Sequence, residues 1–317
     1  DQENNPNGND AADRDGDIYF QRSDDEGESW DSLKVLSLFD EDEENDLDYT
    51  SILLQYRTDV AATGNYVHVA WVDYDSYNGG YDIYYTKSSN NGNTWTTPES
   101  VSTASSPGGV TIASSGSDVV IAWVDFGDVF HVSSSNNGNS WSSETEFDSL
   151  STNLNYMPEI IHNEGKFHVI WSNTASGQSV QYTSSEDGFD WSDTVYINTG
   201  GNSGTSYTPV ISADGPKLYA AWSDSGNYDG DSSSDYDIVG AVSDDNGETW
   251  QEDKLFIDTP VVNLTTSFFF LITSTDFEDE ICEIWYLQLK SSNKVKSLSI
   301  IILSARSGIP CKPKRVA

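Results

Sequence analysis

The chain has 317 residues, of which 52 are acidic and 15 are basic, giving a net charge of −37 at pH 7. A surface of this sign repels nucleic acid and anionic membranes, so it excludes nucleic-acid binding and favours cations, basic partners or a salty extracellular medium. No apolar run is long enough to span a bilayer, so membrane insertion is not expected either.

In chain order, the first recognisable elements are two short strand-like segments at 17–23 and 30–37. Four longer units follow, and each contains an apolar run, a strand ending near a Trp and a third alternating segment. Alternation of β-forming residues with polar ones is typical of half-buried strands. The predicted first strands are 58–63, 109–114, 158–163 and 208–213; the second are 66–73, 118–125, 166–173 and 217–224; the third are 82–88, 128–134, 180–185 and 237–243.

An octet of similar sequence follows each third segment, and the Trp that ends it is expected to begin a fourth strand. The five octets are SDDEGESW (23–30), SSNNGNTW (88–95), SSNNGNSW (134–141), SSEDGFDW (184–191) and SDDNGETW (243–250). Their tryptophans are 65, 46, 50 and 59 residues apart, and periods near this length indicate a propeller or another repeat array.

The octets have the composition of a tight turn. The Gly supplies a positive φ, the acidic or amide side chain two positions earlier accepts backbone N–H groups, and the Trp buries a large ring between sheets. The residues predicted for these three roles are Asp25, Gly27 and Trp30; Asn90, Gly92 and Trp95; Asn136, Gly138 and Trp141; Glu186, Gly188 and Trp191; and Asp245, Gly247 and Trp250.

The octet pattern S-x-D-x-G-x-[ST]-W resembles the Asp-box, or bacterial neuraminidase repeat, of the sialidase superfamily. The resemblance covers about residues 17–257. It implies an all-β, sialidase-like β-propeller of four-stranded antiparallel blades, with six blades expected. In that family the Asp-boxes are structural and lie away from the active site. The octets are therefore expected to hold the blades together rather than to carry chemistry.

Two regions follow from this interpretation. Residues 1–257 are expected to form the Asp-box blades, namely an N-terminal half-blade and four full blades. Residues 258–317 form a divergent segment that is the last blade, the closure of the ring or a sequence that has lost the repeat. The segment 17–37 is expected to pair with residues beyond 257, because an open sheet edge would otherwise remain. From 254 onward the chain carries 8 basic and 6 acidic residues, unlike the acidic remainder.

The resemblance also raises an enzymatic alternative, an exo-sialidase type of glycoside hydrolase. Sialidases use three Arg to bind the sugar carboxylate, a Tyr–Glu pair as nucleophile and an Asp as acid/base. Arg57 matches the first Arg, although Thr58 and Asp59 replace the Ile and Pro that follow it in the family. Arg57 and Asp59 are thus the candidate catalytic residues. The corresponding positions of the other units hold Gly109, Met157 and Thr208, which cannot replace a guanidinium.

The loops opposite the octets are long and rich in Asp, Asn, Tyr and Gly, and long loops on a rigid scaffold commonly carry function. We expect a binding or adhesion module at the cell surface or outside the cell, with a glycan or a protein as ligand. The candidate ligand-binding residues are Tyr56, Arg57, Tyr74, Tyr77, Tyr156, Tyr207 and Tyr228.

No cofactor is required by this interpretation, but calcium is a candidate ligand of the loop at 223–237. Oxygen-rich loops that contain Gly suit Ca²⁺, which prefers six to eight oxygen ligands. The candidate metal ligands are Asp224, Asp229, Asp231, Asp235 and Asp237. The histidines give no metal pattern: His68 and His168 occupy the same place in their strands, which favours a structural role.

Overall fold

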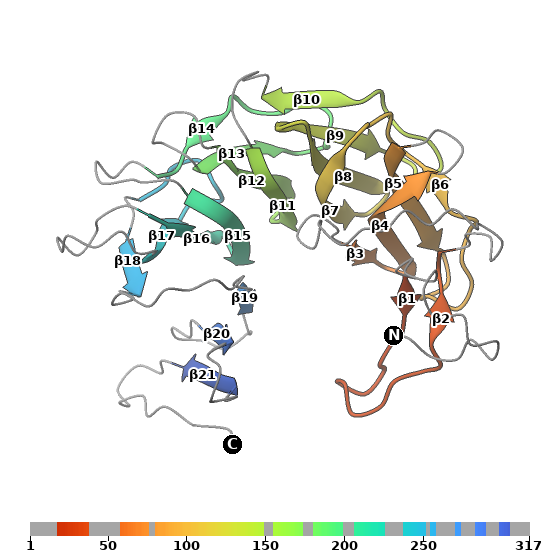
Figure 1. Ribbon diagram of the computed structural model, residues 1–317, viewed down its shortest axis with the longest axis horizontal. Helices are drawn as coiled ribbons and strands as arrows, with labels where there is room; N and C mark the ends of the chain where they lie inside the picture. Colours follow the sequence, from red (N-terminus) through yellow and green to blue (C-terminus); the bar gives the residue numbers. More distant parts are fainter. Residues whose placement is uncertain are drawn as a thin grey trace.

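The computed structural model describes residues 18–37, 58–75, 80–148, 155–173, 180–198, 206–225, 237–251, 254–257, 270–273, 283–289 and 298–304. The described residues form strands and turns and contain no helix, so none of them belongs to a helix that could cross a membrane. Figure 1 shows the sheets following one another around an open arc.

Four sheets are four-stranded, antiparallel and built from consecutive strands, as the repeat predicts. They are β3 (Thr58–Thr63), β4 (Tyr66–Asp75), β5 (Gly80–Ser88) and β6 (Glu99–Ser100); β7 (Pro107–Ser115), β8 (Asp118–Asp125), β9 (Asp128–Ser134) and β10 (Thr145–Asp148); β11 (Asn155–Asn163), β12 (Lys166–Asn173), β13 (Val180–Ser185) and β14 (Val195–Tyr196); and β15 (Ser206–Asp214), β16 (Lys217–Asp224), β17 (Asp237–Ser243) and β18 (Lys254–Ile257).

The first strands of these sheets line the inside of the arc. β3 lies against β7, β7 against β11, β11 against β15, and β15 against β19. This radial arrangement of antiparallel sheets is that of a β-propeller, which confirms the predicted fold. The sequence predicted that the octet Trp begins the fourth strand. The structure differs, because each of the five strands that follow an octet begins four residues after its Trp.

Apolar side chains pack between neighbouring sheets rather than within one. Trp71, Trp123, Trp171 and Trp222 hold the same place in the second strands, and each is at most 1% exposed. One buried cluster combines Ile83 of β5 with Val110 of β7 and Trp123 of β8. A single sheet therefore cannot bury its own apolar faces, and stability comes from stacking consecutive sheets.

The two ends of the arc carry smaller sheets. β1 (Tyr19–Phe20) pairs with β2 (Lys34–Val35), and β19 (Phe270–Thr273), β20 (Glu283–Leu289) and β21 (Leu298–Ser304) form a three-stranded sheet. Among the described residues β1 and β2 pair with each other, and the expected pairing of 17–37 with residues beyond 257 stays a prediction. Whether 258–317 is a last blade or a closing segment stays a prediction.

Candidate functional site

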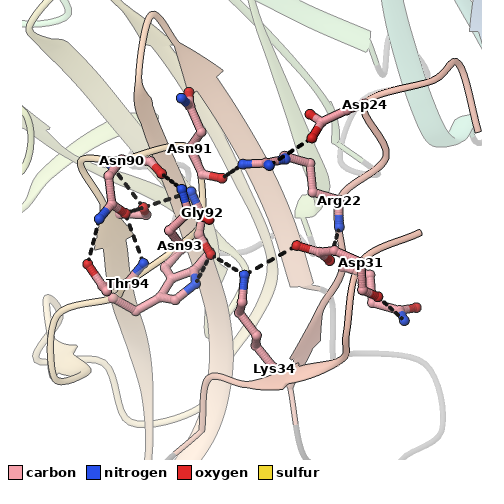
Figure 2. Close-up of polar contacts among 12 residues, drawn as sticks. Arg22, Asp24, Asp31, Lys34, Asn90, Asn91, Gly92, Asn93 and Thr94 are labelled. Atoms are coloured by element: carbon pink, nitrogen blue, oxygen red, sulfur yellow. Dashed lines mark hydrogen bonds and ion pairs between the residues drawn. The ribbon is translucent and has the colours of Figure 1, made fainter. Parts of the chain in front are cut away.

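Each octet turn is held by a Ser that precedes the acidic or amide residue. In 88–95, Gly92 N donates to Ser88 Oγ (2.8 Å), Ser88 Oγ donates to Asn90 Oδ1 (2.9 Å), and Thr94 N donates to the same Asn90 oxygen (2.8 Å). Figure 2 shows the Asn90 side chain closing the turn over Thr94. The backbone donors of the turn are thus satisfied by side chains, which is a structural function.

The same pattern recurs in 23–30, 134–141 and 243–250. Where the central residue is Asp, these donors stabilise its ionised carboxylate. The hydroxyl and the N–H of Ser29 lower the pKa of Asp25 to about 2. The Thr249 donors likewise lower the pKa of Asp245. The carboxylates of Asp25 and Asp245 are therefore held ionised, as acceptors, and are not arranged for proton transfer.

The octet at 184–191 corrects one assignment. The sequence predicted Glu186 as the acceptor, but Asp187 takes that role: Ser185 Oγ donates to Asp187 Oδ1 (3.1 Å), which also accepts from the N–H of Phe189 (2.8 Å) and Asp190 (3.0 Å). Gly188 N donates to the Ser three residues before it, whereas the other octets span four. The segment from the Ser to the Gly is one residue shorter in this octet. The residue two positions before Gly188 is therefore Glu186, which is not the acceptor.

The octet tryptophans join neighbouring sheets. Each of four Trp rings stands edge-on to a ring of the preceding sheet that lies three residues before the Ser of that sheet's octet turn, with centroids about 5 Å apart: Phe20–Trp95 (4.8 Å), Tyr85–Trp141 (4.8 Å), His131–Trp191 (5.4 Å) and Tyr182–Trp250 (5.0 Å). Such T-shaped pairs stabilise beyond the area that they bury. The sequence did not assign the partner rings, although their recurrence at one strand position was visible.

Trp30 of the first octet has no preceding sheet among the described residues and is 61% exposed. The glycine of each later octet also lies against the preceding sheet: a Cβ at Gly138 would be 2.0 Å from the Tyr85 hydroxyl. Two of the fifteen predicted octet residues therefore differ from expectation: Asp187 replaces Glu186 as the acceptor, and Trp30 is exposed rather than buried between sheets.

The basic side chains that the structure describes gather at the octet face. Arg22 donates to the carbonyl of Asn91, and Lys34 Nζ donates to the carbonyl of Gly92 (2.7 Å), so both hold the next octet turn (Figure 2). Lys87 Nζ does the same at the carbonyl of Asn137 (2.7 Å).

The other two basic residues with described side chains contact carboxylates of an octet instead. Lys166 pairs with Glu248 at 2.5 Å, and Lys217 lies 4.0 Å from Asp244. These five are all the Lys and Arg residues whose side chains the structure describes. The described part of the opposite face therefore carries no cationic side chain.

His68 and His168 are structural, as their repeated position favoured. Each is fully buried, and its Nδ1 lies 2.7 Å from a Tyr hydroxyl of the adjacent third strand, Tyr85 and Tyr182 respectively. Burial lowers the pKa of both histidines to about 4 and raises the pKa of Tyr182 to about 12. No group of three or more His, Cys, Asp and Glu suited to a metal occurs among the described residues.

Toward the face opposite the octets, the inner strands β7, β11 and β15 each contain a β-bulge at the same position. Gly109, Met157 and Thr208 have φ values of +58°, +36° and +46°, and each bulge faces the buried Trp of the neighbouring second strand. A positive φ in a β-branched residue such as Thr208 is an outlier. The bulges show that these three positions correspond to one another.

Arg57 itself lies outside the described residues. The second catalytic candidate, Asp59, contacts the neighbouring sheet: its Oδ2 accepts from Thr111 Oγ1 and from Ile112 N, both at 2.9 Å. Since Thr111 Oγ1 in turn accepts from Ile160 N (3.3 Å), this carboxylate begins a polar chain across three inner strands. These contacts give Asp59 a structural function.

Of the candidate metal ligands, Asp229, Asp231 and Asp235 lie outside the described residues. Asp224 and Asp237 are directly opposite each other on β16 and β17, and are 0% and 1% exposed. Ser206 Oγ donates to Asp224 Oδ2 at 2.6 Å. The structure therefore brings together two of the five carboxylates at the mouth of the long loop.

The candidate ligand-binding tyrosines are described only in part. Tyr56, Tyr77 and Tyr228 lie outside the described residues, whereas Tyr74 and Tyr156 lie near the ends of β4 and β11. Tyr207 is half-buried beside the Thr208 bulge. Their common role in binding stays a prediction.

No family model matches the chain, and no curated protein matches it. Among solved structures, it is similar to the GH93 α-L-arabinofuranosidase of Fusarium graminearum in complex with arabinobiose (TM-score 0.53, 11% identity, 80% of this chain and 83% of that one). It is also similar to the NanB sialidase of Streptococcus pneumoniae (TM-score 0.51, 10% identity, 80% of this chain and 60% of that one). At these identities the likeness concerns the fold, which is that of the β-propeller glycosidases.

Proposed function

We propose that this protein is an extracytoplasmic Asp-box propeller that binds a glycan without net negative charge through the face opposite the octet turns. The observation that carries the proposal is the distribution of charge. All five described Lys and Arg side chains lie at the octet face, where they hold turns, and the opposite face presents carboxylates with no described cation to bind an anionic sugar. Carboxylate oxygens accept hydrogen bonds from sugar hydroxyls.

The fold supports a saccharide rather than a protein as ligand, because the two similar structures are those of glycosidases. The test is an array of immobilised glycans that includes neutral arabinans, xylans and galactans as well as sialylated glycans. We expect binding to a neutral glycan and none to sialylated ones. Binding restricted to sialylated glycans, or to no glycan at all, contradicts the proposal.

The alternative function is hydrolysis of a glycosidic bond, which one feature of the sequence favours: Arg57 immediately precedes the predicted strand 58–63, as Gly109, Met157 and Thr208 stand at the starts of the corresponding strands. The assay is turnover of a fluorogenic sialoside and of an aryl α-L-arabinofuranoside across pH 4–8, beside an Arg57→Ala variant. A single Arg cannot fix a sugar carboxylate as three do, so we expect no sialoside turnover. Robust turnover that is lost in the variant makes the chain a hydrolase.

We also propose that the loop after Asp224 binds calcium. Asp224 and Asp237 lie directly opposite each other where the two strands meet this loop, and their carboxylate oxygens are ligands of the kind that Ca²⁺ prefers. A cation that binds only the native state raises its stability by mass action. We expect millimolar Ca²⁺ to raise the melting temperature of the wild type and not of an Asp224→Asn variant. No shift in the wild type removes the proposal.

A further inference from the structure

The shortest connection on the face opposite the octets is the hairpin between β8 and β9. Asp125 and Asp128 are directly opposite each other, so the loop consists of Phe126 and Gly127 alone. Their φ values are +50° and +95°, which is the pattern of a type I′ turn. The turn projects a Phe from the rigid end of two long strands.

Phe is an unfavourable residue for this place. Both central positions of a type I′ turn need positive φ, so Asn, Asp and Gly are strongly preferred, and a bulky side chain there is an outlier. The other two-residue turns that the structure describes carry no aromatic residue: Gly64, Gly116 and Gly215 take the positive φ at the first position of three of them, and the fourth, which has positive φ at both positions, is Glu164–Gly165. An aromatic residue at Phe126 is therefore an exception within this chain.

Packing does not compensate for the strain. The Phe126 side chain is 76% exposed, the largest exposure among the large hydrophobic side chains that the structure describes. A ring in this position loses the benefit of burial as well as the preferred backbone conformation. Strained residues of this kind gather at ligand-binding sites, where the strained conformation presents a side chain to the ligand.

We infer that Phe126 is a ligand-contacting residue, on which the apolar face of a neutral saccharide ring stacks. The inference rests on the proposed glycan-binding function and adds a residue that the sequence did not indicate. Stacking would bury the exposed ring and so supply the favourable free energy that the free protein lacks.

The neighbours of Phe126 suit a sugar. Asp125 is held in place, because its Oδ1 accepts from Ser106 N (2.8 Å) and its Oδ2 from Ser105 N (3.3 Å). Each carboxylate oxygen accepts more than one hydrogen bond, so sugar hydroxyls can still donate to it. A basic side chain of a protein ligand would gain less binding free energy from Asp125, because a solvent-exposed ion pair contributes little.

The experiment compares four proteins by melting temperature and by binding to the neutral glycan that the wild type binds most tightly on the array. In Phe126→Asn the strain is relieved and the ring is removed, so we expect the melting temperature to rise by about 2–4 °C while binding weakens about tenfold. Phe126→Trp keeps a ring and should keep binding. Phe189→Asn removes an aromatic side chain that is 43% exposed on the octet face and should leave binding unchanged.

The outcomes separate the two proposals. If the wild type binds a glycan and Phe126→Asn binds it equally well, the inference is wrong and the glycan-binding function stands. If the wild type binds no glycan on the array, the proposed function fails and the inference fails with it. If Phe126 is required instead for binding of an oligolysine peptide, the ligand is cationic and the saccharide assignment is wrong.

Discussion

The ring of Trp95 stands edge-on to the ring of Phe20 at a centroid distance of 4.8 Å, although the two residues belong to different sheets. The same contact joins three further pairs of sheets, so the repeated octet connects each blade to the one before it. This explains why the chain keeps a Trp at the end of every octet. The turn itself needs only the Ser, the central acceptor and the Gly.

The first prediction compares two tryptophans of the same motif. Trp95→Ala removes a ring that packs against the preceding sheet, and we expect a loss of about 3 kcal/mol in unfolding free energy. Trp30 is 61% exposed, so Trp30→Ala should change stability by less than about 0.5 kcal/mol. Chemical denaturation of both variants measures the difference. Equal losses would show that the Trp stabilises its own turn rather than the contact between sheets.

A second prediction uses two glycines with similar backbone conformations. Gly27 and Gly138 have φ values of +88° and +66°, but a Cβ at Gly27 meets nothing within 4 Å, whereas one at Gly138 would lie 2.0 Å from the Tyr85 hydroxyl. Gly27→Ala should therefore cost only about 1 kcal/mol of backbone strain. Gly138→Ala should cost more, because Tyr85 must also move. Thermal melts that rank the two variants in the reverse order contradict the close approach seen between the sheets.

The fold could be predicted from the sequence because its signals are local and repeated. The strands predicted at 118–125, 166–173 and 237–243 coincide with β8, β12 and β17. Packing between sheets was not predictable in this way, since contacts such as that of Phe20 with Trp95 join distant parts of the chain. The strained backbone was not predictable either, because neither Phe126 nor Thr208 is of a residue type that commonly adopts a positive φ.

The third prediction tests the corrected octet. Asp187→Ala removes the acceptor of the Phe189 and Asp190 N–H groups, so we expect it to destabilise the protein by about 1 kcal/mol. These N–H donors also lower the pKa of Asp187, so its contribution should be lost as the pH falls through and below 3.8, the ordinary value for this carboxyl. Glu186→Ala is the matched control and should be neutral. A larger effect of Glu186→Ala would restore the assignment made from the sequence.

The low pKa values of the buried histidines predict a loss of stability as the pH falls below neutral. Burial lowers the pKa of His68, His131 and His168 to about 4 from an ordinary value of 6.5, so the unfolded chain binds more protons than the folded one between these values. Stability is therefore complete above pH 6.5 and falls as the pH drops toward 4. The octet carboxylates respond at lower pH, because the pKa of Asp25 falls from 3.8 to about 2.

The fourth prediction isolates one of these histidines. The ring of His131 stacks on Phe147 at a centroid distance of 4.2 Å and meets Trp191 edge-on, so Phe, a slightly larger aromatic ring, can make the same two ring contacts. At pH 7 we expect His131→Phe to lie within about 1 kcal/mol of the wild type. Each His whose pKa is lowered by burial adds up to about 1.4 kcal/mol per pH unit to the acid slope, and the variant lacks one such residue. Urea unfolding at pH 7, 5.5 and 4.5 should therefore show a shallower slope for the variant than for the wild type. An unchanged slope would mean that His131 takes up its proton in the folded protein as readily as in the unfolded chain.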